Sequence, residues 1–378
     1  MHFLIEGIAS VTWQQLVMYV IGALLIYLAI NKDMEPSLLV GMGLGAILVN
    51  LPNSGVLNQT MEGIGEAQGV IEWLFEVGIE ASEALPILLF IGIGAMIDFG
   101  PLLSNPIMFL FGAAAQFGIF ITIVFAILLG FDLKDAASIG MIGAADGPTS
   151  ILVSQVLRSK YMGQIAVAAY SYMALVPIIQ PAAIRLVTTK NERRIRMTYN
   201  PKSVSKRTRL IFPVVVTFVA GFIAPMSVSL VGFLMFGNII RECGVLNSLS
   251  ETAQNSFANS ITLLLGLTIS FSMKAEAFVT KETILIMLLG LFAFVFDTIG
   301  GVLFAKFINL FRKEKINPMV GAAGISAFPM SSRVVQKMAI EEDPTNHILM
   351  HAAGSNVSGQ IASAVAGGII ISLVSGLI

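Results

Sequence analysis

The sequence predicts an all-α polytopic membrane protein with two structurally repeated halves and broken or re-entrant helices near the midplane of the bilayer. Of its 378 residues, 56% are hydrophobic and only 12% are charged, and the mean hydropathy is +0.85. A soluble globular protein carries about 25% charged residues. A water-soluble fold of this composition would therefore expose much of its apolar surface, whereas lipid can cover that surface directly.

Apolar stretches recur along almost the whole chain, and each is a candidate membrane span. Several fall short of the roughly 20 residues that a full span requires, and others are long enough to tilt. Short stretches beside long ones are typical of broken or re-entrant helices. The clearest stretches are residues 14–30, 37–51, 84–97, 107–130, 163–187, 210–234, 258–272, 283–310 and 360–378.

Composition divides the chain into two membrane segments joined by a basic loop. We expect residues 1–188 to form the first membrane repeat, residues 189–209 the loop, and residues 210–378 the second repeat. Within the first repeat, residues 52–82 are more polar and rich in glutamate. We expect this part to be an extramembranous loop that ends in an interfacial amphipathic helix.

The segment from Arg185 to Arg209 is the strongest topology signal. It carries nine lysine and arginine residues against one acid, Glu192. By the positive-inside rule, this loop is cytoplasmic. A short basic run between two spans marks topology rather than a nucleic-acid site, so we expect no nucleic-acid partner.

The two halves resemble each other where small residues gather. Residues 143–150 (GAADGPTS) correspond to residues 321–328 (GAAGISAF) at an offset of 178 residues. A looser match between the stretches that begin at Leu88 and Leu264 has an offset of 176 residues. The nearly equal offsets favour an internal duplication, and chance similarity among small apolar residues is the alternative. Duplicated transporters bind their substrates where the broken helices of the two repeats meet.

Asp146 is the leading candidate for a functional group. A carboxylate near the middle of a membrane costs about 2.5–3.5 kcal/mol on insertion scales, so it needs a partner or a function. Gly147 and Pro148 follow it and do not favour a continuing helix, so the chain should unwind and free carbonyl oxygens there. With the hydroxyls of Thr149 and Ser150, these oxygens suit a small cation. Asp146 can also simply cap the second half-helix, and the two interpretations are compatible.

The second half contains a similar segment between Asn317 and Arg333. Its prolines and glycines, among them Pro318 and Gly321, predict another unwound stretch. The planar donor fork of Arg333 suits a carboxylate or a carbamate. An arginine that anchors the cytoplasmic end of a span is the alternative.

Four further polar residues lie in apolar surroundings. The phenol of Tyr172 can donate a proton, or it can pack and find a hydrogen-bond partner, as most buried tyrosines do. Asn356 stands near two serines just before the last apolar stretch. These neutral oxygens can bind a cation or serve helix packing. Asp98 and Asp297 each follow an apolar run, and they either line an aqueous path or mark helix ends.

These motifs resemble those of the β subunit of the biotin-dependent, sodium-translocating decarboxylases of bacteria and archaea. The family serves enzymes that act on oxaloacetate, methylmalonyl-CoA, glutaconyl-CoA or malonate, and the resemblance covers nearly the whole chain. The residues that carry it are 143–149 (GAADGPT), Asn317, Pro318, Gly321, Ser326, Arg333 and 354–360 (GSNVSGQ).

The resemblance implies a carboxybiotin decarboxylase subunit of an oligomeric complex in a bacterial or archaeal inner membrane. In such a complex an α (carboxyltransferase) subunit moves a carboxyl group to biotin, and a biotin-carrier protein or domain brings carboxybiotin to the membrane. A γ subunit is a further partner. The β subunit then decarboxylates carboxybiotin, consumes a proton and exports Na⁺. The implied cofactors are Na⁺ and carboxybiotin, the latter supplied by a partner and not bound covalently to this chain.

The resemblance also implies roles for individual residues. Asp146 and Asn356, with Ser326, would bind Na⁺, and Tyr172 and Ser326 would serve the sodium and proton path. Asn317, Gly321 and Arg333 would shape the second-half site or the carboxybiotin pocket. The implied catalytic residues are Asp146, Tyr172, Ser326 and Arg333.

Two alternative functions share the predicted fold. A sodium-coupled secondary transporter or Na⁺/H⁺ antiporter would have the same broken helices and oxygen sites. A non-catalytic membrane anchor for an enzyme complex would have the spans without a need for Asp146.

Overall fold

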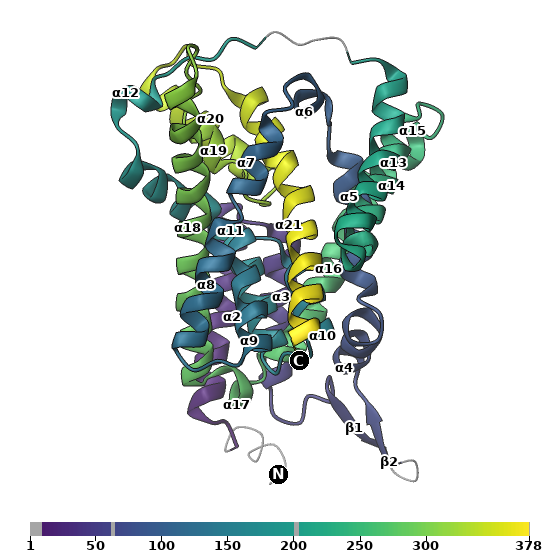
Figure 1. Ribbon diagram of the computed structural model, residues 1–378. Helices are drawn as coiled ribbons and strands as arrows, with labels where there is room; N and C mark the ends of the chain where they lie inside the picture. Colours follow the sequence, from purple (N-terminus) through teal and green to yellow (C-terminus); the bar gives the residue numbers. More distant parts are fainter. Residues whose placement is uncertain (1–9, 62–64, 200–203, 378) are drawn as a thin grey trace.

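The structure is a computed structural model that describes residues 10–61, 65–199 and 204–377. Most of these residues are helical, and the long helices lie side by side in one bundle (Figure 1). In the described part of the chain, 6 helical segments are long and apolar enough to cross a membrane. This confirms the prediction of an all-α polytopic membrane protein. The six segments are Trp13–Lys32, Met108–Leu128, Met162–Val187, Asn247–Met273, Lys281–Phe311 and Leu349–Leu377.

The part of the chain before the basic loop contains ten helices of the α type and one hairpin within the described ranges. They are α2 (Trp13–Lys32), α3 (Pro36–Asn50), β1 (Asn58–Met61), β2 (Gly65–Gln68), α4 (Val70–Phe75), α5 (Ala84–Met96), α6 (Gly100–Ser104), α7 (Met108–Ala114), α8 (Phe117–Leu128), α9 (Leu133–Gly140), α10 (Gly147–Val156) and α11 (Met162–Val187). A π turn (Glu76–Glu80) and a 3₁₀ turn (Met141–Ala144) extend α4 and α9.

The described part of the basic loop contains the short helix α12, the loop's last residues begin α13, and the remaining helices follow. These helices are α12 (Lys190–Arg193), α13 (Lys206–Ile223), α14 (Val228–Glu242), α15 (Asn247–Thr252), α16 (Ala258–Ile269), α17 (Ala275–Phe278), α18 (Lys281–Phe311), α19 (Met319–Ala322), α20 (Met330–Glu342) and α21 (Leu349–Leu377). Short turns lie at Pro225–Ser227, Ala253–Phe257 and Ser270–Met273.

Side-chain caps start several of these helices where the sequence changes from loop to apolar run. Thr12, Asp132 and Thr280 each accept a hydrogen bond from the amide three residues later. Such caps satisfy amides that have no partner inside a helix. They therefore mark the first residues of α2, α9 and α18.

Two predicted segments differ from the structure. The polar stretch 52–82 contains an antiparallel hairpin in which Asn58 pairs with Gln68, and residues 62–64 of it lie outside the described residues. The helix that follows is bent by 66° against α5 and forms a broken span or re-entrant loop with it. The apolar stretch 210–234 is two helices, because the chain turns at Pro225–Ser227 between α13 and α14.

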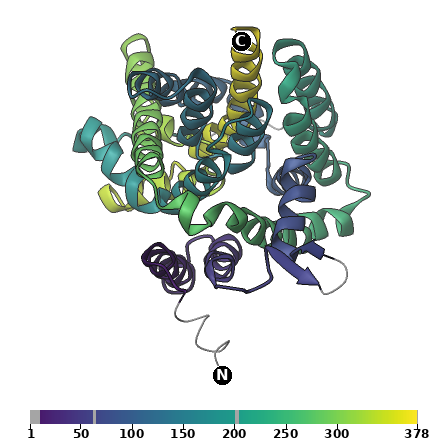
Figure 2. The same cartoon turned by 90° about the horizontal axis from the view of Figure 1, so that it is seen from below.

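Two outer pairs of helices flank the broken helices α9–α10 and α19–α20. Seen from the end that carries the hairpin, the α2–α3 pair lies at one edge of the bundle, where α3 packs on α16 (Figure 2). The α13–α14 pair lies at another side and packs on α21 and α5. The breaks between α9 and α10 and between α19 and α20 lie inside the bundle, where irregular backbone can be satisfied by protein rather than exposed to lipid.

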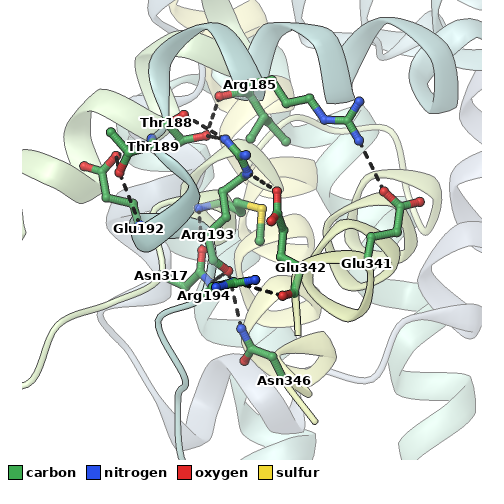
Figure 3. A network of polar contacts seen from close by, with 12 residues as sticks. Arg185, Thr188, Thr189, Glu192, Arg193, Arg194, Asn317, Glu341, Glu342 and Asn346 are labelled. Carbon is green, nitrogen blue, oxygen red and sulfur yellow. Dashed lines mark hydrogen bonds and ion pairs between the residues drawn. The ribbon is translucent and has the colours of Figure 1, made fainter. Parts of the chain in front are cut away.

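The basic loop is tied to the C-terminal end of α20 by ion pairs (Figure 3). The central pair is mostly buried, with 12% of the arginine side chain and 16% of the glutamate side chain exposed. The three pairs are Arg185–Glu341 at 3.2 Å, Arg193–Glu342 at 2.7 Å and Arg196–Asp343 at 2.7 Å. We call this set the α20 clamp. Residues 200–203 of the loop lie outside the described residues.

We predict that acid weakens the α20 clamp. The hydrogen bond from Arg193 lowers the pKa of Glu342. The hydroxyl and amide of Thr345, followed by Arg196, lower the pKa of Asp343 to about 2. Because the folded pKa values are depressed, this stabilisation is complete above the unfolded values of about 4.3 and 3.9. It is lost as the pH falls through the folded values.

The measurement is hydrogen–deuterium exchange of the segment 193–197, corrected for intrinsic rates, from neutral pH down to pH of about 3. Exchange should stay constant from neutral pH down to a pH of about 4 and rise below it. The variant Glu342→Gln should show raised exchange already at neutral pH, whereas the exposed Glu314→Gln should not. Unchanged protection in Glu342→Gln would show that the ion pair does not hold the loop.

Candidate functional site

The first broken helix is formed by α9 and α10. Helix α9 ends at Gly140, and the 3₁₀ turn continues to Ala144. Ala145 then takes a left-handed conformation with φ of 52°, which ends the helical path, and Asp146 begins α10. The break therefore precedes Gly147 and Pro148 rather than falling on them. A proline fits the first turn of a helix, where its missing N–H has no helical partner to lose.

The carboxylate of Asp146 is 4% exposed and accepts three hydrogen bonds. The amide and the hydroxyl of Thr149 donate to it over 3.2 and 2.7 Å, and the hydroxyl of Ser363 donates over 2.6 Å. Asp146 thus caps α10, and the N-terminus of that helix adds partial positive charge beside it. These donors offset the cost of burying a carboxylate.

The second broken helix is formed by α19 and α20, with residues 323–329 between them. Ser326 lies in the middle of this second break. Its amide donates to the carbonyl of Ala144 over 3.0 Å, so the two breaks touch. Its hydroxyl donates to the carbonyl of Gly359 over 2.9 Å. The structure therefore brings Ser326 against the turn that leads to Asp146.

Helix α21 lies against both breaks and presents three polar side chains to them. Asn356, Gln360 and Ser363 are spaced by four and three residues, which places them on one side of the helix. The amide nitrogen of Asn356 donates over 2.7 Å to a carbonyl of the second break, and that of Gln360 donates to the carbonyl of Ser326. Because Ser363 donates to Asp146, this face of α21 joins the two breaks.

A cavity of about 170 Å³ lies where these elements meet. Asp146, Ser326 and Gln360 line one side of it, and α3, α5 and α16 contribute to the rest of the wall. The polar groups of the wall are carboxylate, hydroxyl and amide, which offer the hard oxygens that small cations prefer.

Tyr170 and Tyr172 lie on different sides of α11. Tyr170 lines the cavity and packs so closely on Gly147 that a Cβ there would lie 2.2 Å from the tyrosine ring. The buried hydroxyl of Tyr170 has no hydrogen-bond partner. The hydroxyl of Tyr172 donates instead to the carbonyl of Met287 on α18. Two residues along a helix differ by about 200°, so the structure does not bring Tyr172 together with Asp146.

Arg333 lies on α20 with its side chain exposed. Its positive charge acts on Glu35, which precedes α3 and lines the cavity. Arg333 itself is not part of the cavity wall. Glu35 has no signal in the sequence, because it lies in a short connection between two apolar stretches.

Asn317 and Gly321 are not part of the cavity wall. The amide nitrogen of Asn317 donates to the carbonyls of Arg193 and Ile195 over 2.8 and 2.9 Å, which ties the basic loop to the start of α19 (Figure 3). A Cβ at Gly321 would lie 2.0 Å from the carbonyl oxygen of Gly301. Gly321 therefore lets α19 approach α18, and both residues shape the second break from outside.

The oxygens around Asp146 fit an alkali cation better than a transition metal. Within the described ranges, no group of three or more His, Cys, Asp and Glu residues could hold a metal ion. The hydroxyls of Thr149 and Ser363 have lone pairs that remain available when their protons point to the carboxylate. The side-chain oxygen of Asn356 is buried without a partner. Asn356 itself is hydrogen-bonded to the second break rather than to Asp146.

A bundle of spanning helices in which two broken helices meet at a buried carboxylate defines a membrane protein that moves small cations. Comparison with known proteins identifies the family to which the chain belongs. Residues 14–374 match the model of the family described as the Na⁺-transporting oxaloacetate decarboxylase beta subunit. The chain belongs to this family.

Its relatives include β subunits of three different decarboxylases. The methylmalonyl-CoA decarboxylase subunit beta of Propionigenium modestum is 46% identical, covering 97% of this chain and 96% of the relative. The glutaconyl-CoA decarboxylase subunit beta of Acidaminococcus fermentans is 45% identical, covering 98% and 96%. The probable oxaloacetate decarboxylase beta chain of Vibrio cholerae is 41% identical, covering 98% of each. The chain is thus the membrane subunit of a biotin-dependent, sodium-pumping decarboxylase complex, which confirms the resemblance found in the sequence.

We predict opposite effects on stability at the two tyrosines. Tyr172→Phe removes a hydrogen bond to the carbonyl of Met287, at a cost of about 0.5–1.5 kcal/mol. Tyr170→Phe removes a buried hydroxyl that has no partner, so stability should stay the same or rise. Thermal unfolding of the two variants in one detergent measures the difference. A larger loss in Tyr170→Phe would show that its hydroxyl has a partner in the protein.

Proposed function

We propose that this chain decarboxylates carboxybiotin delivered by a partner, takes up a proton in that reaction and couples it to the export of Na⁺. The observation that supports this most directly is the Asp146 carboxylate, which is buried where two broken helices touch and is surrounded by hydroxyl and amide groups. A carboxylate in this place holds either a proton or a sodium ion. The two cations therefore compete for one site.

The chemistry explains why the two cations are exchanged. When carboxybiotin loses CO₂, the bond between the biotin nitrogen and the carboxyl carbon breaks, and the nitrogen takes a proton. A proton supplied by Asp146 leaves its carboxylate free to bind Na⁺, and release of Na⁺ lets it take a proton again. The membrane potential opposes cation export by about 2.3 kcal/mol per charge per 100 mV. Decarboxylation must therefore be tied to ion movement.

The other polar residues have supporting roles in this proposal. Asn356 and Ser326 supply neutral oxygens for Na⁺ from α21 and the second break. Tyr172 serves the sodium and proton path from the side of α11 that faces α18. Arg333 attracts the carboxylate of carboxybiotin with its exposed donor fork.

Two residues of the second half act indirectly. Asn317 holds the basic loop at the start of α19, and Gly321 allows α19 to pack against α18. In this proposal they keep the second break in the shape that presents Ser326 to the cavity.

Partners and orientation complete the proposal. The sequence has no Ala-Met-Lys-Met biotin acceptor, since Lys337 in Gln336-Lys337-Met338 lacks the preceding residues. Biotin therefore arrives on a carrier protein or domain that an α carboxyltransferase subunit has loaded, with a γ subunit as a further member. We place the basic loop on the cytoplasmic side of a bacterial or archaeal cell membrane, between repeats 1–188 and 210–378.

We predict that Asp146→Asn abolishes coupling without unfolding the protein. An asparagine still caps α10 but cannot exchange a proton for Na⁺. Sodium-dependent decarboxylation of free carboxybiotin by the purified complex should fall by about 100-fold or more. Asp98→Asn is the matched control, because Asp98 lies near Arg209 outside the cavity. Wild-type activity in Asp146→Asn would leave a membrane anchor as the remaining function.

We also predict that the chain, purified under mild conditions from its own cells, carries a biotinylated protein. An avidin blot of the purified complex measures this. A secondary transporter or antiporter has no need for such a partner, so a complex free of biotin would contradict the proposal. Pretreatment of the lysate with excess avidin is the control for non-specific capture.

A further inference from the structure

Asp297 is a second buried carboxylate in the membrane part of the protein. It lies near the middle of α18, which has 31 residues, and it is 0% exposed. It therefore marks neither a helix end nor an aqueous surface. An ionisable residue at such a position persists only with a partner or a function.

One oxygen of this carboxylate is fully occupied. Oδ1 accepts hydrogen bonds from the amides of Gly118 over 2.5 Å and Ile119 over 3.2 Å. Both amides belong to the first turn of α8, which has 12 residues, and the amide of Ile119 is shared with the carbonyl of Gln116 at 3.2 Å. Close packing of α8 on α18 requires glycine at residue 118, since a Cβ there would lie 2.4 Å from the carbonyl oxygen of Ala293, 2.5 Å from the amide nitrogen of Asp297 and 2.8 Å from its Oδ1.

The other oxygen has no partner. Oδ2 of Asp297 is buried without a hydrogen bond and faces Gly143, where a Cβ would lie 2.5 Å from it. The same Cβ would lie 2.8 Å from the methyl group of Ala293, so alkyl carbon as well as glycine backbone lies on this side of the carboxylate. A sodium ion needs several oxygens around it, whereas a proton needs no coordination shell. A proton is therefore the cation that suits Oδ2.

Gly143 connects this carboxylate to the site already described. It begins a stretch of four residues in which Gly143 touches Asp297, Ala144 accepts from the amide of Ser326, and Ala145 has the left-handed conformation. The fourth residue is Asp146. A change in the position of this stretch must therefore change the surroundings of both carboxylates.

We propose that Asp297 carries a proton on Oδ2 and exchanges it during the transport cycle, in step with the occupancy of Asp146. The step balances with water: the carboxylic acid gives its proton to a water molecule in the ion path and becomes a carboxylate, and it takes one proton back from a hydronium ion when the Gly143–Asp146 stretch returns. The proposal rests on the proposed sodium–proton exchange and extends it to a second titratable group.

Few other titratable groups face Asp297. The packed segments α7, α8, α19 and the 3₁₀ turn Met141–Ala144 contain none. On α18 itself the nearest charged residue, Lys306, lies nine residues away, or about 13.5 Å along the helix, and pairs with Glu192 over 2.9 Å. The titratable residues of the other packed segments are Lys134 and Asp135 of α9, Tyr170, Tyr172 and Arg185 of α11, and Lys281 and Glu282 at the start of α18.

The test separates proton exchange from simple hydrogen bonding. Asp297→Asn keeps an oxygen for the amides of Gly118 and Ile119 but cannot exchange a proton. In the purified complex, it should keep the wild-type melting temperature and the bound biotin carrier. Its sodium uptake into proteoliposomes should fall by about 100-fold and lose its pH dependence. Thr298→Val, which removes a neighbouring buried hydroxyl without a partner, is the matched control and should transport normally.

Two outcomes would overturn the proposal at this step. Wild-type uptake in Asp297→Asn would show that Asp297 acts only as a hydrogen-bond acceptor for α8. A large loss of melting temperature with no change in the pH profile of the remaining uptake would assign it a structural role alone.

A second measurement does not depend on the folding of Asp297→Asn. Infrared difference spectra of the complex, recorded between neutral and alkaline pH, read the C=O stretch of carboxyl groups that lose their proton. In a background of Asp146→Asn and Glu35→Gln, a protonated carboxyl that responds to pH should remain, and its absence would overturn the proposal. Failure of the proposed function can be distinguished from failure of this proposal. It would appear as wild-type activity in the single variant Asp146→Asn, in which Asp297 is unchanged.

Discussion

The hydrogen bond between the Ser326 amide and the Ala144 carbonyl joins the two broken helices, and the geometry of the cavity depends on it. Inside a membrane, every backbone group that leaves a helix needs a partner from the protein. Each break here supplies a partner for the other. Side chains complete the set: the hydroxyl of Ser150 donates to the carbonyl of Met141 over 3.2 Å, and the amide of Gln360 donates to the carbonyl of Ser326. The two breaks beside the cavity thus have backbone groups paired with each other and with side chains of α10 and α21.

This constraint gives the polar residues of α21 two functions at once. The nitrogen of Asn356 satisfies carbonyls of the second break, which leaves only its oxygen for an ion. Ser363 donates a hydrogen bond to Asp146 and so fixes the position of the start of α10 along α21. Structural and ion-binding roles therefore cannot be separated at these positions by deletion of the side chain, and conservative exchanges that keep one donor or one acceptor are more informative.

The sequence predicted the fold class from local composition, and it singled out Asp146 because a carboxylate is costly in an apolar run. It also indicated Ser326 and Asn356 through motifs. It could not distinguish Tyr170 from Tyr172, since the direction of a side chain depends on which face of α11 packs inward. Glu35 and Asp297 were obscured for a related reason. Their surroundings are built by segments more than 100 residues away, such as α20 for Glu35 and α8 for Asp297.

The α20 clamp also bears on how the two halves are connected. Three arginines of the basic segment 185–209 are paired with Glu341, Glu342 and Asp343 of the same subunit. The described part of the loop is therefore held against the end of α20 and is not a flexible linker between the halves. A tilt of α20 would displace the contact area of a protein that docks on this surface. In the other direction, a displacement of that area would be transmitted through α20 to the second break.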